Sequence, residues 1–219
     1  MRSIIVDKLI DQQDQPSASQ RSDSADYFDA LYHNSHDPWE YEQRWYEQRK
    51  RQICMALLLK PMYENVLEIG CSNGVFSAYL AQRAQRLICL DANLKAVQLA
   101  QARLQHSAHV TVMQQCIPEQ FPTGMFDLIV ISEIMYYLAP EQLSELIEKV
   151  QTALAPNGIV LCCHWRYAIE GFSLNGENVH RLLKQQFALY HYLHLDDADF
   201  VLDIWSKESA SLAMQEGLI

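Results

Sequence analysis

Short, continuously apolar runs alternate with segments of helical periodicity along most of the chain. The apolar runs that predict strands are residues 65–70, 86–92, 110–114, 126–134, 158–165, 189–195 and 199–206. The segments that predict helices are residues 74–84, 94–106, 139–156 and 176–187. Apolar strands without polar alternation are typical of a parallel sheet covered on both faces, and the last two strands, joined by a turn, predict an antiparallel hairpin. The pattern predicts an α/β fold with a doubly wound, mostly parallel, seven-stranded sheet.

The N-terminal part follows a different pattern. Residues 11–24 are rich in Gln, Ser and Asp and have almost nothing to bury, which predicts a flexible lead-in. From about Pro38 a helical pattern runs to Pro61. We therefore expect four parts: a lead-in at 1–24, a helical cap at 25–61, the α/β domain at 62–208 and a tail at 209–219.

Charge and composition narrow the classes of partner. The chain has 219 residues and a formal net charge of −10, and an acidic surface disfavours nucleic acid. The basic run at 49–51 is expected to be a solvated helix face.

The six cysteines lie mostly in apolar runs without a CxxC pair, which indicates buried, reduced thiols and no metal site. The N-terminal apolar patch is too short for a signal peptide and no run approaches a membrane span of about 20 residues, so we expect a cytoplasmic protein without membrane contact.

A carboxylate and two glycines stand where the first predicted strand ends, in the stretch VLEIGCSNG. Ligands of open α/β sheets bind at the carboxyl ends of the strands. The dinucleotide motif GxGxxG fails here: counted from Gly70 as the first place, the third place is Ser72 and the sixth place is not glycine. Glu68 would repel a pyrophosphate and suits a ligand that carries an ammonium or sulfonium group. Asp91, at the end of the second strand, can accept hydrogen bonds from both hydroxyls of a ribose.

The pattern E-x-G-x-[small]-x-G, followed by Asp91, resembles the signature of class I S-adenosylmethionine-dependent methyltransferases, with Ser72 in place of the usual middle glycine. The stretches DPWEYEQRWYEQRK, SEIMYYL and HWR…GENVH are similar to the nodulation protein S (NodS) group within that superfamily. The resemblance covers about residues 27–206. It implies a Rossmann-like methyltransferase fold, S-adenosyl-L-methionine as the cofactor and an N-terminal helical cap that closes over it.

The resemblance also implies which residues form the cofactor site. They are Trp39, Arg49 or Lys50, Glu68, Gly70, Ser72, Gly74, Asp91, Ala92, Cys116, Ile117 and Ser132. In this assignment Trp39 covers the cofactor, and either Arg49 or Lys50 pairs with its carboxylate. Cys116 stands where the family usually carries an acidic residue for the adenine amino group, so backbone amides and apolar neighbours are expected to hold the adenine.

Members of the group methylate a free amine on a deacetylated chitin-like oligosaccharide, so the resemblance implies an acceptor with a primary amine on a small sugar-containing molecule. It places Ser132, Glu133, Tyr136 and Tyr137 near the reacting centre. An amine must be unprotonated to attack, so a group that accepts its proton is useful. Glu133 is preferred for binding the ammonium or taking its proton, with His164 as a helper, although His164 could equally well cap its strand.

Several alternatives stay open at this level. Trp165 suits stacking on a sugar ring or a cationic nitrogen, and His180 is more simply structural. Residues 167–175 are expected to form a loop that sets acceptor specificity. The main alternative function is O- or S-methylation of another small metabolite. A non-catalytic cofactor-binding relative and a nicotinamide oxidoreductase are the others, and the oligomeric state stays open.

Overall fold

The computed structural model describes residues 19–219 and the side chains from Ser24 onward. The strands are β1 (Tyr63–Ile69), β2 (Ala84–Asp91), β3 (Val110–Gln114), β4 (Phe126–Ser132), β5 (Leu154–Trp165), β6 (Tyr190–Asp196) and β7 (Phe200–Ser206). The α-helices are α1 (Ser19–Asn34), α2 (Trp45–Ala56), α3 (Val75–Leu80), α4 (Leu94–Leu104), α5 (Pro140–Ala153), α6 (Gly176–Gln186) and α7 (Leu212–Gln215). Two 3₁₀ turns complete the set, η1 (Ala81–Arg83) and η2 (Met135–Tyr137). None of the helices within this described part is long and apolar enough to cross a bilayer.

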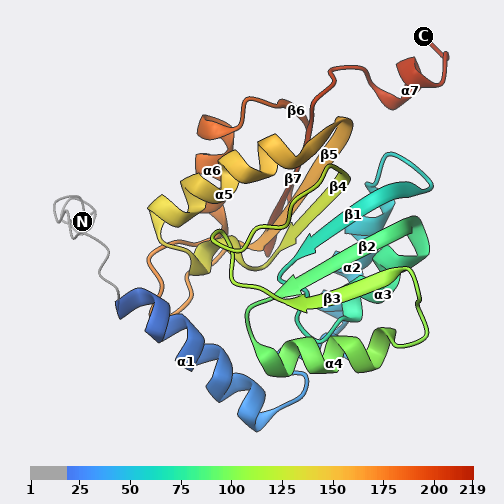
Figure 1. The fold of residues 1–219 in the computed structure, drawn as a ribbon. Helices are drawn as coiled ribbons and strands as arrows, with labels where there is room; N and C mark the ends of the chain where they lie inside the picture. Colours follow the sequence, from blue (N-terminus) through green and yellow to red (C-terminus); the bar gives the residue numbers. More distant parts are fainter. Residues whose placement is uncertain (1–18) are drawn as a thin grey trace, which may run out of the picture.

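The seven strands form one sheet in the order β3-β2-β1-β4-β5-β7-β6. The first five run parallel, and β7 lies antiparallel between β5 and β6 (Figure 1). The prediction of a doubly wound, mostly parallel sheet with a C-terminal antiparallel hairpin is confirmed. The strand order reverses between β1 and β4, so the carboxyl ends of these two strands open the crevice where such sheets bind ligands.

Apolar side chains fill both faces of the sheet, as its continuous apolar strands require. On one face, Val66 of β1 and Leu128 of β4 pack with residues from α2, α3 and α4. On the other face, Ile129 of β4 and Val160 of β5 pack with residues from α5 and α6. These two layers hold the strand ends rigidly in place, which is what a binding site on those ends needs.

The N-terminal cap differs from expectation in two places. The helix expected from about Pro38 begins only at Trp45, because the carboxylate of Asp37 accepts the backbone N–H groups of Tyr41 and Glu42 and stabilises a series of turns. A further helix, α1, begins at Ser19, inside the segment that was expected to be a lead-in, whose residues 1–18 lie outside the described part. Figure 1 shows α1 crossing the end of the sheet toward which the arrowheads of the parallel strands point.

Two predictions about burial need correction. The basic run at 49–51 is not a solvated face, because the side chains of Lys50 and Arg51 are buried and only Arg49 remains partly exposed. Five of the six cysteines are buried free thiols as expected, but Cys116 lies exposed after β3. The helix α2 therefore carries charge into the interior of the protein.

Candidate functional site

A cavity of about 930 Å³ lies at the carboxyl ends of the parallel strands. Its floor comes from the ends of β1, β2 and β4, and its roof from α1 and the turns before α2. The predicted residues that line it are Trp39, Lys50, Gly70, Ser72, Asp91, Ala92, Cys116, Ile117, Ser132, Glu133, Tyr136, Tyr137 and Trp165. The structure thus brings together, in one cavity, most of the residues that the sequence selected from distant parts of the chain.

The turn after β1 keeps its backbone in left-handed conformations. Gly70 has φ 81°, Ser72 has φ 51° and Gly74 has φ 77°. A side chain on Gly70 would lie 2.1 Å from Cγ2 of Ile134, so only glycine lets the chain pass there. Gly74 does not line the large cavity. It lies at the start of α3, where an added Cβ would be 2.9 Å from Cα of Ala100 in α4.

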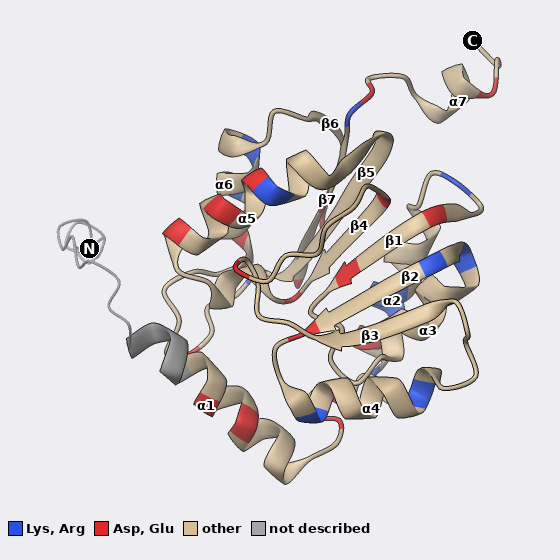
Figure 2. Cartoon of the chain, in the orientation of Figure 1, with Lys and Arg blue, Asp and Glu red and all other residues tan. Residues whose placement is uncertain are grey.

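Asp91 closes the end of β2 and reaches back to that turn. Its Oδ2 accepts the backbone N–H of Ser72 at 2.8 Å, and its Oδ1 accepts the N–H of Asn93 at 2.9 Å. Burial raises the pKa of Asp91, although these hydrogen bonds oppose the rise. Each carboxylate oxygen can accept a second hydrogen bond, so Asp91 can still bind a pair of hydroxyl groups in the cavity. Figure 2 shows acidic residues at the arrowheads of both β1 and β2.

Glu68 lies behind the turn and does not line the large cavity. Its Oε2 accepts the hydroxyl of Ser77 at 2.5 Å, and its side chain borders a small adjoining cavity of about 40 Å³. Burial raises the pKa of Glu68 to about 7, with the Ser77 hydrogen bond opposing the rise. The small cavity shares Gly70 and Lys50 with the large one, so Glu68 lies next to the large cavity without lining it, and its role in cofactor binding stays a prediction.

The two candidate cations of α2 have different surroundings. Arg49 donates to Oδ2 of Asp197 at 2.6 Å and lies away from the cavity. Lys50 is buried, and its Nζ donates to Oε1 of Glu133 at 2.5 Å and to Glu47 at 3.1 Å. Burial opposes the charge on Lys50, but these two carboxylates outweigh it and raise its pKa. Lys50 therefore remains a cation in the cavity wall.

Glu133 connects three parts of the wall. Its Oε2 accepts the hydroxyl of Tyr136 at 2.6 Å and the backbone N–H of Trp165 at 2.7 Å, while Oε1 accepts from Lys50. Its backbone is left-handed, with φ 62°, which is a strained conformation for a residue with a side chain. Oε2 has both of its lone pairs occupied, whereas Oε1 accepts from Lys50 and keeps a second lone pair for a donor in the cavity. Glu133 thus holds Lys50, η2 and β5 together and can still accept one more hydrogen bond.

Aromatic rings form the roof of the cavity. The ring centroid of Tyr137 lies 4.8 Å from that of Phe28 in α1 and 4.7 Å from that of Phe172 in the loop after β5. Trp39 packs on Tyr32, whose hydroxyl lies 2.5 Å from Oγ of Ser72. Sequence reasoning did not select the residues of α1, because no motif marks them. Their signal is the spacing of Phe28 and Tyr32, which places both rings on one face of a helix.

His164 and His180 do not line the cavity. His164 is fully buried behind η2, where its Nε2 accepts the backbone N–H of Met135 at 3.4 Å and its Nδ1 lies 3.0 Å from Nε2 of His180. Burial lowers the pKa of His164 well below its usual range, and the charges of His180 and Lys50 add to this. The role of His164 as a helper in proton transfer is therefore replaced by a structural one.

Comparison with known proteins identifies the family. Residues 27–196 match the family described as nodulation protein S (NodS). Nodulation protein S of Sinorhizobium fredii is 30% identical over 124 residues, which are 56% of this chain and 57% of the relative. The chain thus spans about half the length of the curated relatives it matches.

Solved structures give the same result. A Pseudomonas syringae protein assigned as a methyltransferase is 42% identical, with a TM-score of 0.67, and the match covers 74% of this chain and 99% of that one. The N-methyltransferase NodS from Bradyrhizobium japonicum WM9, solved with S-adenosyl-L-homocysteine, is 27% identical, with a TM-score of 0.76, and the match covers 84% of this chain and 97% of that one. The fold is that of class I Rossmann-like methyltransferases, and the chain belongs to the nodulation protein S family.

Proposed function

We propose that this protein is an S-adenosylmethionine-dependent methyltransferase that methylates a primary amine on a small amino sugar or oligosaccharide. The observation that carries the proposal is that Asp91, at the end of β2, and Glu133, directly after β4, line the same cavity. A ligand with a polar nucleoside at one end and a reacting centre at the other matches a cavity of about 930 Å³.

The residues present fit the cofactor. Asp91 has free lone pairs for ribose hydroxyls, and the tight turn at Gly70 lets the backbone approach a ligand closely. Lys50 uses two of its three donors on Glu47 and Glu133, so the third is available for a carboxylate. Ile117 and Cys116 border the side of the cavity where an adenine would lie, and Trp39 covers it from the cap.

When bound, the cofactor supplies a methyl group activated by its sulfonium. The protein then has to align an acceptor and exclude water. The rings of Tyr136, Tyr137 and Trp165 give flat surfaces for a sugar or a cationic nitrogen beside Glu133. The loop residue Ile169 also borders the cavity, which supports a role of residues 167–175 in acceptor choice.

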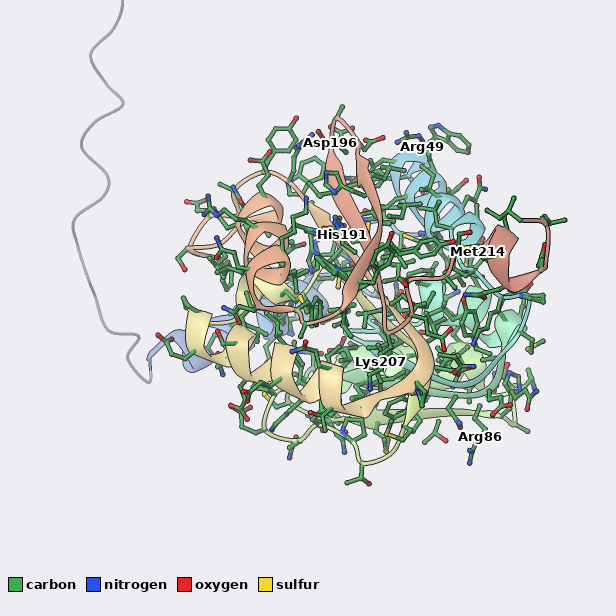
Figure 3. All side chains as sticks on the ribbon, turned by 90° about the horizontal axis from the view of Figure 1, so that it is seen from above. Arg49, Arg86, His191, Asp196, Lys207 and Met214 are labelled. Carbon is green, nitrogen blue, oxygen red and sulfur yellow. The ribbon has the colours of Figure 1, made fainter. Side chains whose placement is uncertain are left out.

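Cofactor binding is tested by calorimetric titration with S-adenosylhomocysteine. We expect the variant Asp91→Ala to lose at least about tenfold in affinity, because it removes the hydroxyl-binding carboxylate. Arg86→Gln is the matched control, because Arg86 is exposed at the other end of the same strand (Figure 3). Unchanged affinity in Asp91→Ala would remove the basis of the proposal.

The acceptor is tested by a methyl-release assay with chitin oligosaccharides that carry a free amine, compared with the same oligosaccharides fully N-acetylated. If the protein methylates an amine, we expect turnover of the oligosaccharides with a free amine and none of the fully N-acetylated ones. Equal turnover of both forms would favour methylation at oxygen, and cofactor binding without turnover of any amine, hydroxyl or thiol compound would favour a binding protein.

A further inference from the structure

The outer strand β6 carries two histidines that a regular strand would keep apart. Side chains three positions apart on a strand point to opposite faces of the sheet. The register between β6 and β7 shifts between His191 and Leu193, which marks a bulge. The bulge moves His191 and His194 onto the same face of the hairpin, and such irregularities are often used to re-aim a side chain.

Both imidazoles point at one carboxylate. Nε2 of His191 lies 2.6 Å and Nδ1 of His194 lies 2.7 Å from the same oxygen, Oδ1 of Asp203 in β7. The three ligating atoms lie within 4.8 Å of one another. Asp203 is completely buried, whereas the side chains of His191 and His194 are 32% and 38% exposed, so the group opens to solvent on the histidine side. Figure 3 shows His191 on this hairpin, whose tip carries Asp196.

The carboxylate is held in place from behind. His180 of α6 lies with Nδ1 2.5 Å from the other oxygen of Asp203, and its Nε2 faces His164. Imidazole and carboxylate groups in this outer position orient metal ligands in many proteins. The ring of His191 is also fixed, because it stacks on Trp205 with centroids 4.2 Å apart. A preformed set of two nitrogens and one oxygen therefore faces solvent.

We propose that His191, His194 and Asp203 bind a divalent transition-metal ion, with Zn²⁺ as the best match to two imidazoles and one carboxylate. At Zn–N and Zn–O bond lengths of about 2.0–2.2 Å, ligand atoms lie somewhat further apart than these hydrogen bonds, so a small outward movement of the histidines makes room for the ion. A solvent molecule completes the coordination on the open side. The proposed site differs from the sequence-based expectation of no metal, and its residues do not line the cavity that contains Asp91.

One neighbouring charge opposes the ion. Nζ of Lys184 in α6 lies 3.5 Å from Nδ1 of His194, on the exposed side of the group. This lysine has to turn away when the metal binds, which its long exposed side chain allows. Lys184→Gln is therefore expected to bind the metal more tightly than the natural sequence.

The test uses the full chain without an affinity tag, after removal of metals by a chelator. Calorimetric titration with ZnCl₂ is expected to show one ion per chain, and titration with MgCl₂ none, because Mg²⁺ prefers oxygen ligands. The double variant His191→Gln, His194→Gln is expected to lose this binding. His106→Gln is the control, because His106 is exposed in another part of the chain and should leave binding unchanged.

Two readouts keep the test decisive if the double variant misfolds. Co²⁺ added to the natural sequence should give the visible absorption of a low-coordinate nitrogen and oxygen site, and His194→Gln should weaken Zn²⁺ binding by at least about tenfold. Absence of one-to-one Zn²⁺ binding in the natural sequence would overturn the proposal. Equal Zn²⁺ binding in the double variant would also overturn it, and would leave the group as a network of hydrogen bonds.

Discussion

Glu133 combines a left-handed backbone with a carboxylate that accepts three hydrogen bonds. Strain of this kind costs about 1–3 kcal/mol and persists only where the surrounding structure fixes it. Here Lys50, Tyr136 and the backbone of Trp165 do so. The strain places the carboxylate at the point where the acceptor and the reacting methyl are proposed to meet, so its charge and position are expected to matter more than its contribution to stability.

We expect Glu133→Gln to lower turnover by about 10²-fold or more, because the amide keeps two hydrogen bonds but loses the charge that pairs with Lys50 and with a cationic acceptor. Affinity for S-adenosylhomocysteine should change by only a few fold. Turnover and calorimetric titration of the same preparation measure both. Glu141→Gln, at an exposed position on α5, is the control, and unaltered turnover in Glu133→Gln would contradict the role given to this residue.

The pKa of Glu68 gives a prediction about stability. Burial raises this pKa to about 7, above the ordinary value near 4.5. The folded state therefore binds the proton more tightly than the unfolded chain, so this stabilisation is fully present below about pH 4.5 and is lost as the pH rises to about 7, by about 3 kcal/mol in total. Glu68→Gln keeps an acceptor for Ser77 and avoids the loss.

Urea unfolding at about pH 5 and pH 8 checks the Glu68 prediction. The natural sequence should lose more stability between these values than Glu68→Gln does, and the variant should be the more stable protein at the higher pH. Glu64→Gln on the same strand is the control, because Glu64 is exposed. The same pH dependence in Glu68→Gln and in the natural sequence would show that the buried carboxyl does not titrate in this range.

At the scale of elements, Gly74 lets the start of α3 pack closely against α4. Gly74→Ala is expected to destabilise the protein by more than the strain of a positive φ alone, because the new Cβ would lie 2.9 Å from the backbone of Ala100. Gly171→Ala is a matched control, since Gly171 has φ 85° but no atom within 4 Å of the added Cβ. Chemical unfolding of both variants separates packing from backbone strain, and equal losses would contradict the packing argument.

The sheet could be predicted from the sequence because most of its strands contain a run of apolar residues, such as VLEI in β1 and LICL in β2. The helix α1 could not, because its residues lack an apolar face that repeats over the whole helix, and packing of rings such as Tyr27 and Phe28 against Tyr137 holds it in place. The bulge in β6 was also not visible, since a single extra residue does not change the pattern of a short strand.

The candidate site could be predicted only in part. Residues at strand ends, such as Asp91 and Glu133, follow from topology, because parallel strands end at one edge. The choice between Arg49 and Lys50 depends on a rotation of about 100° around α2, which only tertiary packing decides. The prediction for His164 rests on its position at the end of a central strand. Both faces of β5 are apolar, so the sequence does not indicate toward which face the side chain of His164 points.

At the scale of the whole molecule, the aromatic face of α1 covers a cavity that belongs to the α/β domain. We expect S-adenosylhomocysteine to slow cleavage by chymotrypsin at Tyr27 and Phe28, because a ligand that contacts both α1 and the sheet stabilises their closed arrangement. Cleavage near the exposed Leu212 in the tail should be unchanged and serves as an internal control. Equal rates at Tyr27 and Phe28 with and without the ligand would contradict this.

Because α1 forms the roof of the cavity, its movement could set the rate at which ligands enter and leave. If α1 has to move aside before ligands can exchange with the cavity, that movement displaces solvent and its rate depends on solvent viscosity. If this step limits the catalytic cycle, kcat should fall in proportion to the viscosity of a sucrose solution, and a poor acceptor, for which bond making is slower, should show no such dependence. If kcat is independent of viscosity for every acceptor, movement of α1 does not limit the catalytic cycle.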